Sequence, residues 1–98
     1  MRVTIDSILV RASEPKAADL DGCVVVLSVR AGAYFGFNRV ASEIWQMLAE
    51  PCRVGWIFDA LRESHDVDPE TVVRDVTPFL QTLLEQKLAR VSDRADAR

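Results

Sequence analysis

The sequence predicts an α+β domain in which a three-stranded antiparallel sheet is followed by three helices. Two observations carry this prediction. Runs of β-branched and aliphatic residues, separated by turn residues, occupy positions 3–37, and such runs are typical of strands. After Asn38, apolar residues recur at helical spacing in three segments, as they do along the buried face of a helix. Because the strands precede the helices, the order indicates an α+β fold and not an alternating α/β fold.

The first predicted strand covers residues 3–10, where β-branched and aliphatic residues partly alternate with polar ones. This alternation suits a strand with one covered face. Residues 12–16 are predicted to form a loop, because Pro15 lacks a backbone donor and restrains the residue before it. The strand should therefore end near Val10.

The second and third strands are predicted to form a hairpin over residues 23–29 and 33–37. Asp21 and Gly22 are a turn signal before the first of them, and its β-branched run is typical of a buried strand. Gly32 can adopt the positive φ that a short connection needs. We therefore expect Cys23, inside this run, to be a small buried apolar residue.

Two helices are predicted over residues 39–49 and 53–64. Asn38 is a good N-cap for the first, since its side-chain oxygen can accept from the free amides of the first turn, and Pro51 ends that helix. The second helix has one apolar stripe, which should face the core. Trp56 lies off this stripe and should be partly exposed.

The third helix is predicted over residues 69–86. Asp68 and Pro69 combine a capping side chain with a proline at the first helical position, which is a strong helix start. Pro78 predicts a kink but not a break. The apolar residues of this helix cover more than one stripe, which is wider than packing against one neighbour requires, so one flank should be free for a partner.

Length and composition indicate one folded domain. A chain of 98 residues fits one compact unit, predicted over residues 1–91, with a polar flexible tail at 92–98. The net charge of −3 and the pI near 5.0 do not suit a nucleic-acid-binding domain. The apolar runs are too short to cross a bilayer, and the first residues do not resemble a secretory signal. These features predict a cytoplasmic protein without a membrane or nucleic-acid partner.

The residues that could carry chemistry do not combine into a catalytic, metal or cofactor site. His65 is the one histidine in the sequence, and a metal site or an activated nucleophile needs further ligands or an orienting group. Cys52 should cap or border the second helix. The glycine-rich phosphate-binding motifs do not occur, so neither of those nucleotide sites is indicated. We therefore expect a protein that is not an enzyme, with His65 at the surface between two helices.

A short sheet beside an unusually apolar helix indicates a possible site for an extended peptide. The edge strand of a sheet carries unpaired N–H and C=O groups that can accept an added strand, and an adjacent helix can supply pockets for its side chains. Periodicity alone also fits a simpler interpretation, in which Tyr34, Phe35 and Phe37 serve only in core and cross-strand packing.

The order of several short motifs resembles the PqqD-like family, whose members are recognition elements for ribosomally synthesised, modified peptides. The likeness covers residues 21–91, and its motifs in order are Asp21-Gly22, Val25-Val26-Leu27, Gly32-Ala33-Tyr34, Phe37-Asn38, Ile44-Trp45, Asp75-Val76, Phe79-Leu80, Leu83 and Leu88. Three positions depart from the family pattern. Lys87 stands where the family often has glycine, Phe37 replaces the usual leucine, and Pro78 bears on the shape of the third helix.

The resemblance implies a winged-helix-like fold and a role in binding the leader segment of a precursor peptide, in the cleft between the third strand and the third helix. Some members of the family deliver the leader to a radical-SAM enzyme in pyrroloquinoline quinone synthesis. Others, the stand-alone B1 proteins of lasso-peptide clusters, partner a cysteine protease that cleaves the leader. The second group is the preferred interpretation, because a free-standing domain without catalytic residues fits it.

We expect the leader to add as an antiparallel strand to the edge at residues 33–37, with its apolar side chains against the third helix. The predicted peptide-binding residues are Ala33, Tyr34, Phe35, Gly36, Phe37, Val73, Val76, Thr77, Leu80 and Leu84. Two other classes stay open. A winged-helix DNA-binding regulator has the same parts but needs a basic recognition helix, and a dimerisation domain could pair the same edge with its own copy.

Overall fold

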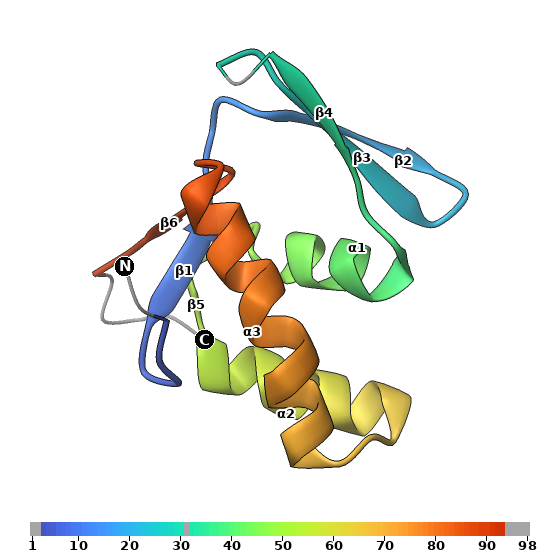
Figure 1. Cartoon of the computed structure of the whole chain (residues 1–98), viewed down its shortest axis with the longest axis vertical. Helices are drawn as coiled ribbons and strands as arrows, with labels where there is room; N and C mark the ends of the chain where they lie inside the picture. Colours follow the sequence, from blue (N-terminus) through green and yellow to red (C-terminus); the bar gives the residue numbers. More distant parts are fainter. Residues whose placement is uncertain (1–2, 31, 94–98) are drawn as a thin grey trace.

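The computed structural model describes residues 3–30 and 32–93, and it confirms the predicted α+β class. The likeness to a winged helix is loose, because the strands divide between two sheets. In chain order the elements are β1 (Ile8–Arg11), β2 (Lys16–Leu20), β3 (Cys23–Ser28), β4 (Ala33–Gly36), α1 (Arg39–Met47), β5 (Cys52–Arg53), α2 (Val54–His65), α3 (Pro69–Glu85) and β6 (Ala89–Val91) (Figure 1).

Strands β2, β3 and β4 form an antiparallel sheet in that order, which we call the open sheet. The predicted hairpin is present as β3 and β4. Asp21 and Gly22, between β2 and β3, have φ angles of 57° and 86°, as a two-residue turn with positive φ at both positions requires. Val24 and Val26 are buried on the inner face of β3. Cys23 was expected to be buried but is half-buried, because its face of the sheet has no covering layer in the described part of the chain.

Strand β1 lies between β5 and β6 in a second antiparallel sheet, which we call the closed sheet. The prediction that residues 3–10 join the sheet of the hairpin is therefore wrong, and the strand begins only at Ile8. Leu9 and Val10 are adjacent and both buried, so both faces of β1 are covered. The partners β5 and β6 are 2 and 3 residues long, which is too short to show a strand pattern in the sequence.

Strand β2 was not predicted from the sequence. Residues 12–15 are irregular, as the predicted loop at residues 12–16 requires, but a strand begins at Lys16 and continues to Leu20. All of its residues are exposed, so no alternation of apolar and polar residues marks it. Main-chain pairing holds it in place, from Lys16 opposite Leu27 to Leu20 opposite Cys23.

The first two helices lie where they were predicted, with ends that differ by at most two residues. The side-chain oxygen of Asn38 accepts the amide of Ala41 at 2.8 Å, which confirms the predicted N-cap of α1. The first helix ends at Met47 and the second at His65. Trp56 is 37% exposed, as its position off the apolar stripe predicted.

Helix α3 begins after Asp68 and continues past Pro78 without a break. Asp68 is the N-cap residue, but its side chain does not make the predicted cap hydrogen bond to a main-chain amide of α3. Its carboxylate instead accepts the hydroxyl of Thr71, and this hydrogen bond holds the pKa of Asp68 below its ordinary value. The hydroxyl of Thr82 donates to the carbonyl of Pro78 at 3.0 Å.

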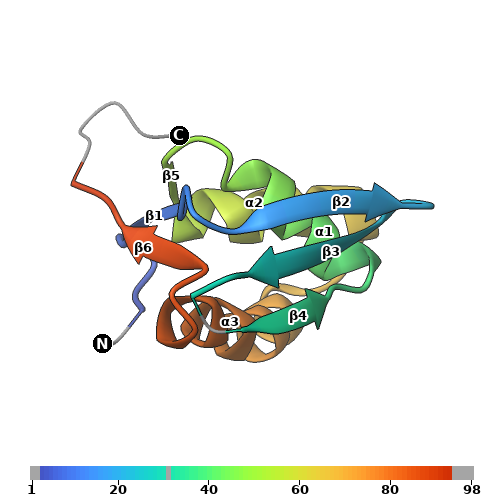
Figure 2. The ribbon, with the colours of Figure 1, turned by 90° about the horizontal axis from the view of Figure 1, so that it is seen from above.

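The core lies between the helices, the closed sheet and the inner face of the open sheet. Figure 2 shows the open sheet over α1, with β4 as its strand nearest α3. The largest side chain that is almost fully enclosed is that of Trp45. Ser92, in the predicted flexible tail, is buried, and its amide donates to Ile8 at 2.7 Å. The rest of the predicted tail, from residue 94 onward, lies outside the described residues.

Candidate functional site

Strand β4 is an edge of the open sheet. It pairs with β3 on one side, and no described strand pairs with its other side. The amide of Phe37, just after β4, donates to Val24 at 2.8 Å. Because main-chain groups alternate in direction along a strand, the N–H and C=O groups of Phe35 then also point toward β3, while those of Tyr34 and Gly36 point outward. Within the described part of the chain, no hydrogen bond uses these outward groups, so they can accept an added strand.

A buried serine on α1 fixes the end of this edge strand. Ser42 is 1% exposed. Its hydroxyl accepts the amide of Val24 at 2.7 Å and donates to the carbonyl of Phe37 at 3.3 Å. One side chain therefore ties β3 and the residue that follows β4 to α1, and this fixes the direction in which the chain leaves β4.

Aromatic contacts place α3 beside the end of β4. The ring of Phe37 lies 5.2 Å from that of Phe79 on α3, at an interplanar angle of 89°, and 5.7 Å from that of Trp45 on α1. Edge-to-face and tilted ring pairs of this kind are favourable beyond the area they bury. They set the separation between the edge strand and the helix.

The face of α3 that points toward the core carries four buried residues, Val72, Val76, Leu80 and Leu83. At 3.6 residues per turn, two flanks border this face. One flank carries Phe79 and Asp75, on the side of β4 and α1. The other carries Val73, Thr77 and Leu84.

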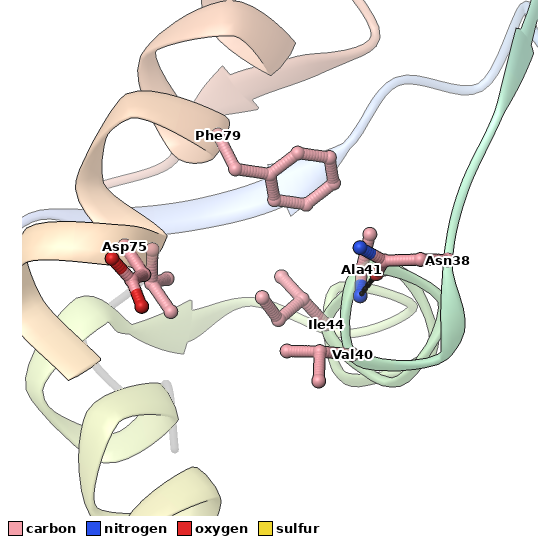
Figure 3. Close-up of a pocket in the computed structure, with 7 residues that line it drawn as sticks. Asn38, Val40, Ala41, Ile44, Asp75 and Phe79 are labelled. Carbon is pink, nitrogen blue, oxygen red and sulfur yellow. Dashed lines mark hydrogen bonds between the residues drawn. The ribbon is translucent and has the colours of Figure 1, made fainter. Parts of the chain in front are cut away.

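A hollow of about 280 Å³ opens between α1 and α3, where β4 ends. Phe79 and Asp75 reach it from α3, and Val40, Ala41 and Ile44 reach it from α1 (Figure 3). Its lining is mostly apolar, and Asp75 is its one charged residue. An apolar side chain of a strand added to β4 could enter this hollow.

The predicted site residues on β4 divide between two roles. Tyr34 is 75% exposed and Phe37 is 9% exposed, while Ala33 and Phe35 are half-buried and Gly36 is exposed. Phe37 therefore belongs to the core, as the simpler packing interpretation expected for it. Tyr34 and Gly36 supply the outward main-chain groups.

The structure does not bring the predicted residues of α3 together at one site. Val76 lines the hollow beside β4, and Leu80 is fully buried. Val73 and Thr77 line a different hollow of about 270 Å³, together with the N-terminal segment. Leu84 is half-buried and, by helical spacing, lies on the flank of Val73. Only Val76 of this set therefore lies at the hollow beside β4.

Sequence reasoning missed Phe79 as a site residue, along with the wall that α1 contributes. Phe79 is three residues beyond Val76, so the helical period placed the two side chains near each other. That signal was available. The sequence held no signal that Val40, Ala41 and Ile44 line the hollow, because they showed only the apolar spacing of an ordinary helix.

His65 and Cys52 have structural surroundings. Nε2 of His65 lies 2.8 Å from a carboxylate oxygen of Glu43, which joins the end of α2 to α1. Cys52 is fully buried in β5, next to the start of α2 as predicted. Among residues 3–30 and 32–93, no group of three or more His, Cys, Asp or Glu side chains could hold a metal ion. None of the helices described is long and apolar enough to span a membrane.

Helix α3 does not present the basic surface that the DNA-binding alternative requires. Arg74 is the one basic residue between Pro69 and Glu85, and its Nε donates to Asp75 at 3.3 Å. A recognition helix would need several basic side chains directed at phosphates and bases.

An unpaired sheet edge beside an apolar hollow defines a small binding domain. The family model of coenzyme PQQ synthesis protein D (PqqD) matches residues 23–89. The chain therefore belongs to the PqqD family, as the motifs between residues 21 and 91 indicated. No curated protein matches the chain.

Two solved structures share the fold. TbiB1, in complex with the TbiA(beta) leader peptide, is 36% identical with a TM-score of 0.75, and the match covers 89% of this chain and 99% of that one. A lasso peptide synthetase B1, complexed with the leader peptide, is 24% identical with a TM-score of 0.68, over 84% of this chain and 96% of that one. At that identity the second structure supports the fold alone.

Proposed function

We propose that this protein binds the leader segment of a ribosomally synthesised precursor peptide by adding it as an antiparallel strand to β4. The observation that carries the proposal is the pair of outward main-chain groups at Tyr34 and Gly36, beside the hollow at Phe79. Membership of the PqqD family and the likeness to TbiB1, which is seen with a leader peptide, support it.

Main-chain pairing and side-chain burial would both contribute to the binding free energy. The outward N–H and C=O groups of Tyr34 and Gly36 offer up to four hydrogen bonds, each worth about 0.5–1.5 kcal/mol net. Alternate side chains of the added strand point to opposite faces, so one set would face α3 and enter the hollow. Together these contacts suit submicromolar affinity, on the order of 8–10 kcal/mol after the flexible peptide has been ordered.

The protein would act by presenting the bound leader to a modifying enzyme and would carry out no chemistry itself. The likeness to TbiB1 favours a partner of the lasso-peptide type, a leader peptidase or cyclase. A radical-SAM enzyme, as in pyrroloquinoline quinone synthesis, is the corresponding partner in the other branch of the family. In either case the cargo is an extended peptide and not a metal or an organic cofactor.

Tyr34→Pro tests the proposal directly. Proline removes the outward amide of Tyr34 but leaves the hydrogen bonds to β3, and edge strands tolerate proline at such positions. Fluorescein-labelled TbiA(beta) leader peptide serves as the probe, and fluorescence polarisation measures its affinity. We expect binding to weaken at least about tenfold, which corresponds to about 1.4 kcal/mol.

Tyr34→Ala is the matched control, because it removes the same exposed ring and keeps the amide. It should bind the probe nearly as well as the wild type. Circular dichroism should show that both variants are folded. Equal affinity of Tyr34→Pro and wild type for the probe would contradict the proposal.

Substitutions at the core face of α3 do not provide this test. Val76 is 5% exposed and Leu80 is fully buried, so an aspartate at either position places an unpaired charge in the core. Such variants are expected to lose the fold together with the binding. Phe79→Ala removes a half-buried ring at the hollow and is the better variant for the helical side of the site.

A further inference from the structure

The hollow beside β4 continues away from the sheet. A second hollow of about 180 Å³ lies between the start of α1, the end of α2 and α3. The two hollows share Val40, Asp75 and Val76, so they adjoin along these residues, and we call the two together the trough. It begins where β4 ends and runs to Val67, which is 39% exposed and follows α2.

The direction of β4 decides which part of a bound peptide meets this trough. Strand β4 runs from Ala33 toward Asn38, and the trough begins at Asn38. An antiparallel partner runs the other way, so its amino-terminal residues lie beside Gly36 and Phe37. The residues that precede the paired segment would therefore lie over the trough.

The walls of the trough are apolar, with one carboxylate between them. Val40, Ile44 and Val76 form walls near the sheet, and Leu61 and Val67 lie at the far end. The Asp75 side chain is 64% exposed and lines both hollows.

His65 and Arg74 lie near this carboxylate, and neither blocks it. His65 also lines the far hollow, but its Nε2 is engaged by Glu43 at 2.8 Å. Arg74 meets Asp75 at 3.3 Å with a side chain that is 74% exposed. An exposed ion pair of this kind is worth little, so a cation from a peptide can compete for the carboxylate.

We infer that this trough recognises the residues immediately amino-terminal to the strand-forming part of the leader, accepting aliphatic or aromatic side chains and a Lys or Arg that meets Asp75. The inference rests on the proposed addition of the leader to β4. It adds a second recognition element, next to the main-chain edge, and gives the leader a chemical signature. Continuity with the edge strand and the single negative charge of the trough identify the occupant as this basic, apolar stretch.

Selection from a random peptide library tests the inference, because the enriched sequences themselves reveal which residues the trough prefers. A display library of random 14-residue peptides is selected on immobilised wild-type protein and, in parallel, on Asp75→Lys. The wild type should enrich Lys or Arg at a fixed position on the amino-terminal side of an alternating apolar segment. Asp75→Lys should lose this enrichment or replace it with Asp or Glu.

Asp59→Lys is the matched control. Asp59 is an exposed α2 acid, 74% accessible, that pairs with Arg62 at 3.5 Å and lies outside the trough. Selection on this variant should give the wild-type pattern. A selected peptide with its basic residue should bind Asp75→Lys at least about tenfold more weakly than it binds wild type, and changing that residue to Glu should restore the affinity.

Two outcomes overturn the inference. One is the same basic preference in Asp75→Lys as in the wild type, and the other is a basic preference on the carboxyl-terminal side of the apolar segment. Failure of the proposed function is separate: the selected peptides would then bind Tyr34→Pro as well as they bind the wild type. If Tyr34→Pro abolishes binding while Asp75→Lys changes nothing, addition to β4 stands and the role of the trough is rejected.

Discussion

The two sheets of this protein have the same number of described strands and opposite surroundings. In the closed sheet, β1 has a partner strand on both sides. Further main-chain hydrogen bonds hold both of its ends. Arg11 donates to Leu48 at 2.9 Å, Ala12 donates to Leu88 at 2.8 Å, and the Ile8 carbonyl accepts Ser92 at 2.7 Å. In the open sheet, β2 is exposed along its whole length and β4 has a partner on one side.

This difference separates the sheet that holds the chain together from the sheet that can take a partner. The closed sheet joins the beginning, the middle and the end of the described chain through β1, β5 and β6. The open sheet contributes its inner face to the core and leaves its outer face and its β4 edge unused. An added strand can therefore pair with β4 without disturbing the contacts on which the fold depends.

The largest expected difference between the sheets comes from the same substitution made in each. Leu9 in β1 is fully buried, and Leu9→Ala should cost about 2–5 kcal/mol of unfolding free energy. Leu27, on the outer face of β3, is half-buried, and Leu27→Ala should cost about 1 kcal/mol or less, because little apolar area is lost. Urea denaturation followed by circular dichroism measures both. Equal losses would break the comparison.

A smaller effect is expected where the open sheet is tied to α1. Ser42→Ala leaves the buried amide of Val24 without its acceptor, which should cost about 1–3 kcal/mol. The matched control is Ser64→Ala, at an exposed serine whose hydroxyl reaches Leu61 at 3.5 Å. That control should change the unfolding free energy by less than about 0.5 kcal/mol. If the two variants are equally stable, Ser42 is not the link between sheet and helix.

The smallest expected effect is a gain in stability at the entry to the closed sheet. Lys87 has a φ of 59°, and the amides of Lys87 and Leu88 donate to Leu84 and Leu83 at 3.1 and 2.9 Å. This is the Schellman pattern that favours glycine after a helix. Lys87→Gly should therefore stabilise the protein by about 1 kcal/mol.

Gln86→Gly is the control, because Gln86 has a negative φ of −85° and gains nothing from glycine. It should leave stability unchanged or lower it slightly. Thermal unfolding compares the two variants. A loss of stability in Lys87→Gly would show that the lysine side chain contributes more than its backbone strain costs.

The parts of the fold that sequence predicted are those with a local signal. The hairpin of β3 and β4 followed from its β-branched run and the connection at Gly32, and the helices followed from their apolar spacing and, for α1, from the N-cap Asn38. Which strands pair with each other in each sheet had no such local signal. β1 pairs with residues more than 40 positions away, as at Leu9 opposite Cys52, and such pairing is decided by tertiary packing. The fully exposed β2 is defined by main-chain pairing alone.

The site was predictable in part for the same reason. A sheet edge at residues 33–37 follows from the order of the strands, and the helix beside it follows from the excess of apolar residues. The flank of α3 that faces β4 depends on how the helix is rotated in the fold. Val73 and Phe79 are both apolar residues of one helix, and their sides are distinguished only in the structure, by the ring contact of Phe79 with Phe37 and by the different hollows that the two residues line.

The docking groups of β4 are main-chain atoms, and this has a consequence for how binding partners can diverge. Every residue except proline presents the same N–H and C=O to Tyr34 and Gly36, so the edge itself does not distinguish one peptide from another. Substitutions in a cognate peptide are therefore tolerated along the segment that pairs with β4, and the residues that must be kept are the few whose side chains reach the helices. A related protein and its peptide can differ at many positions and still pair strand to strand in the same register.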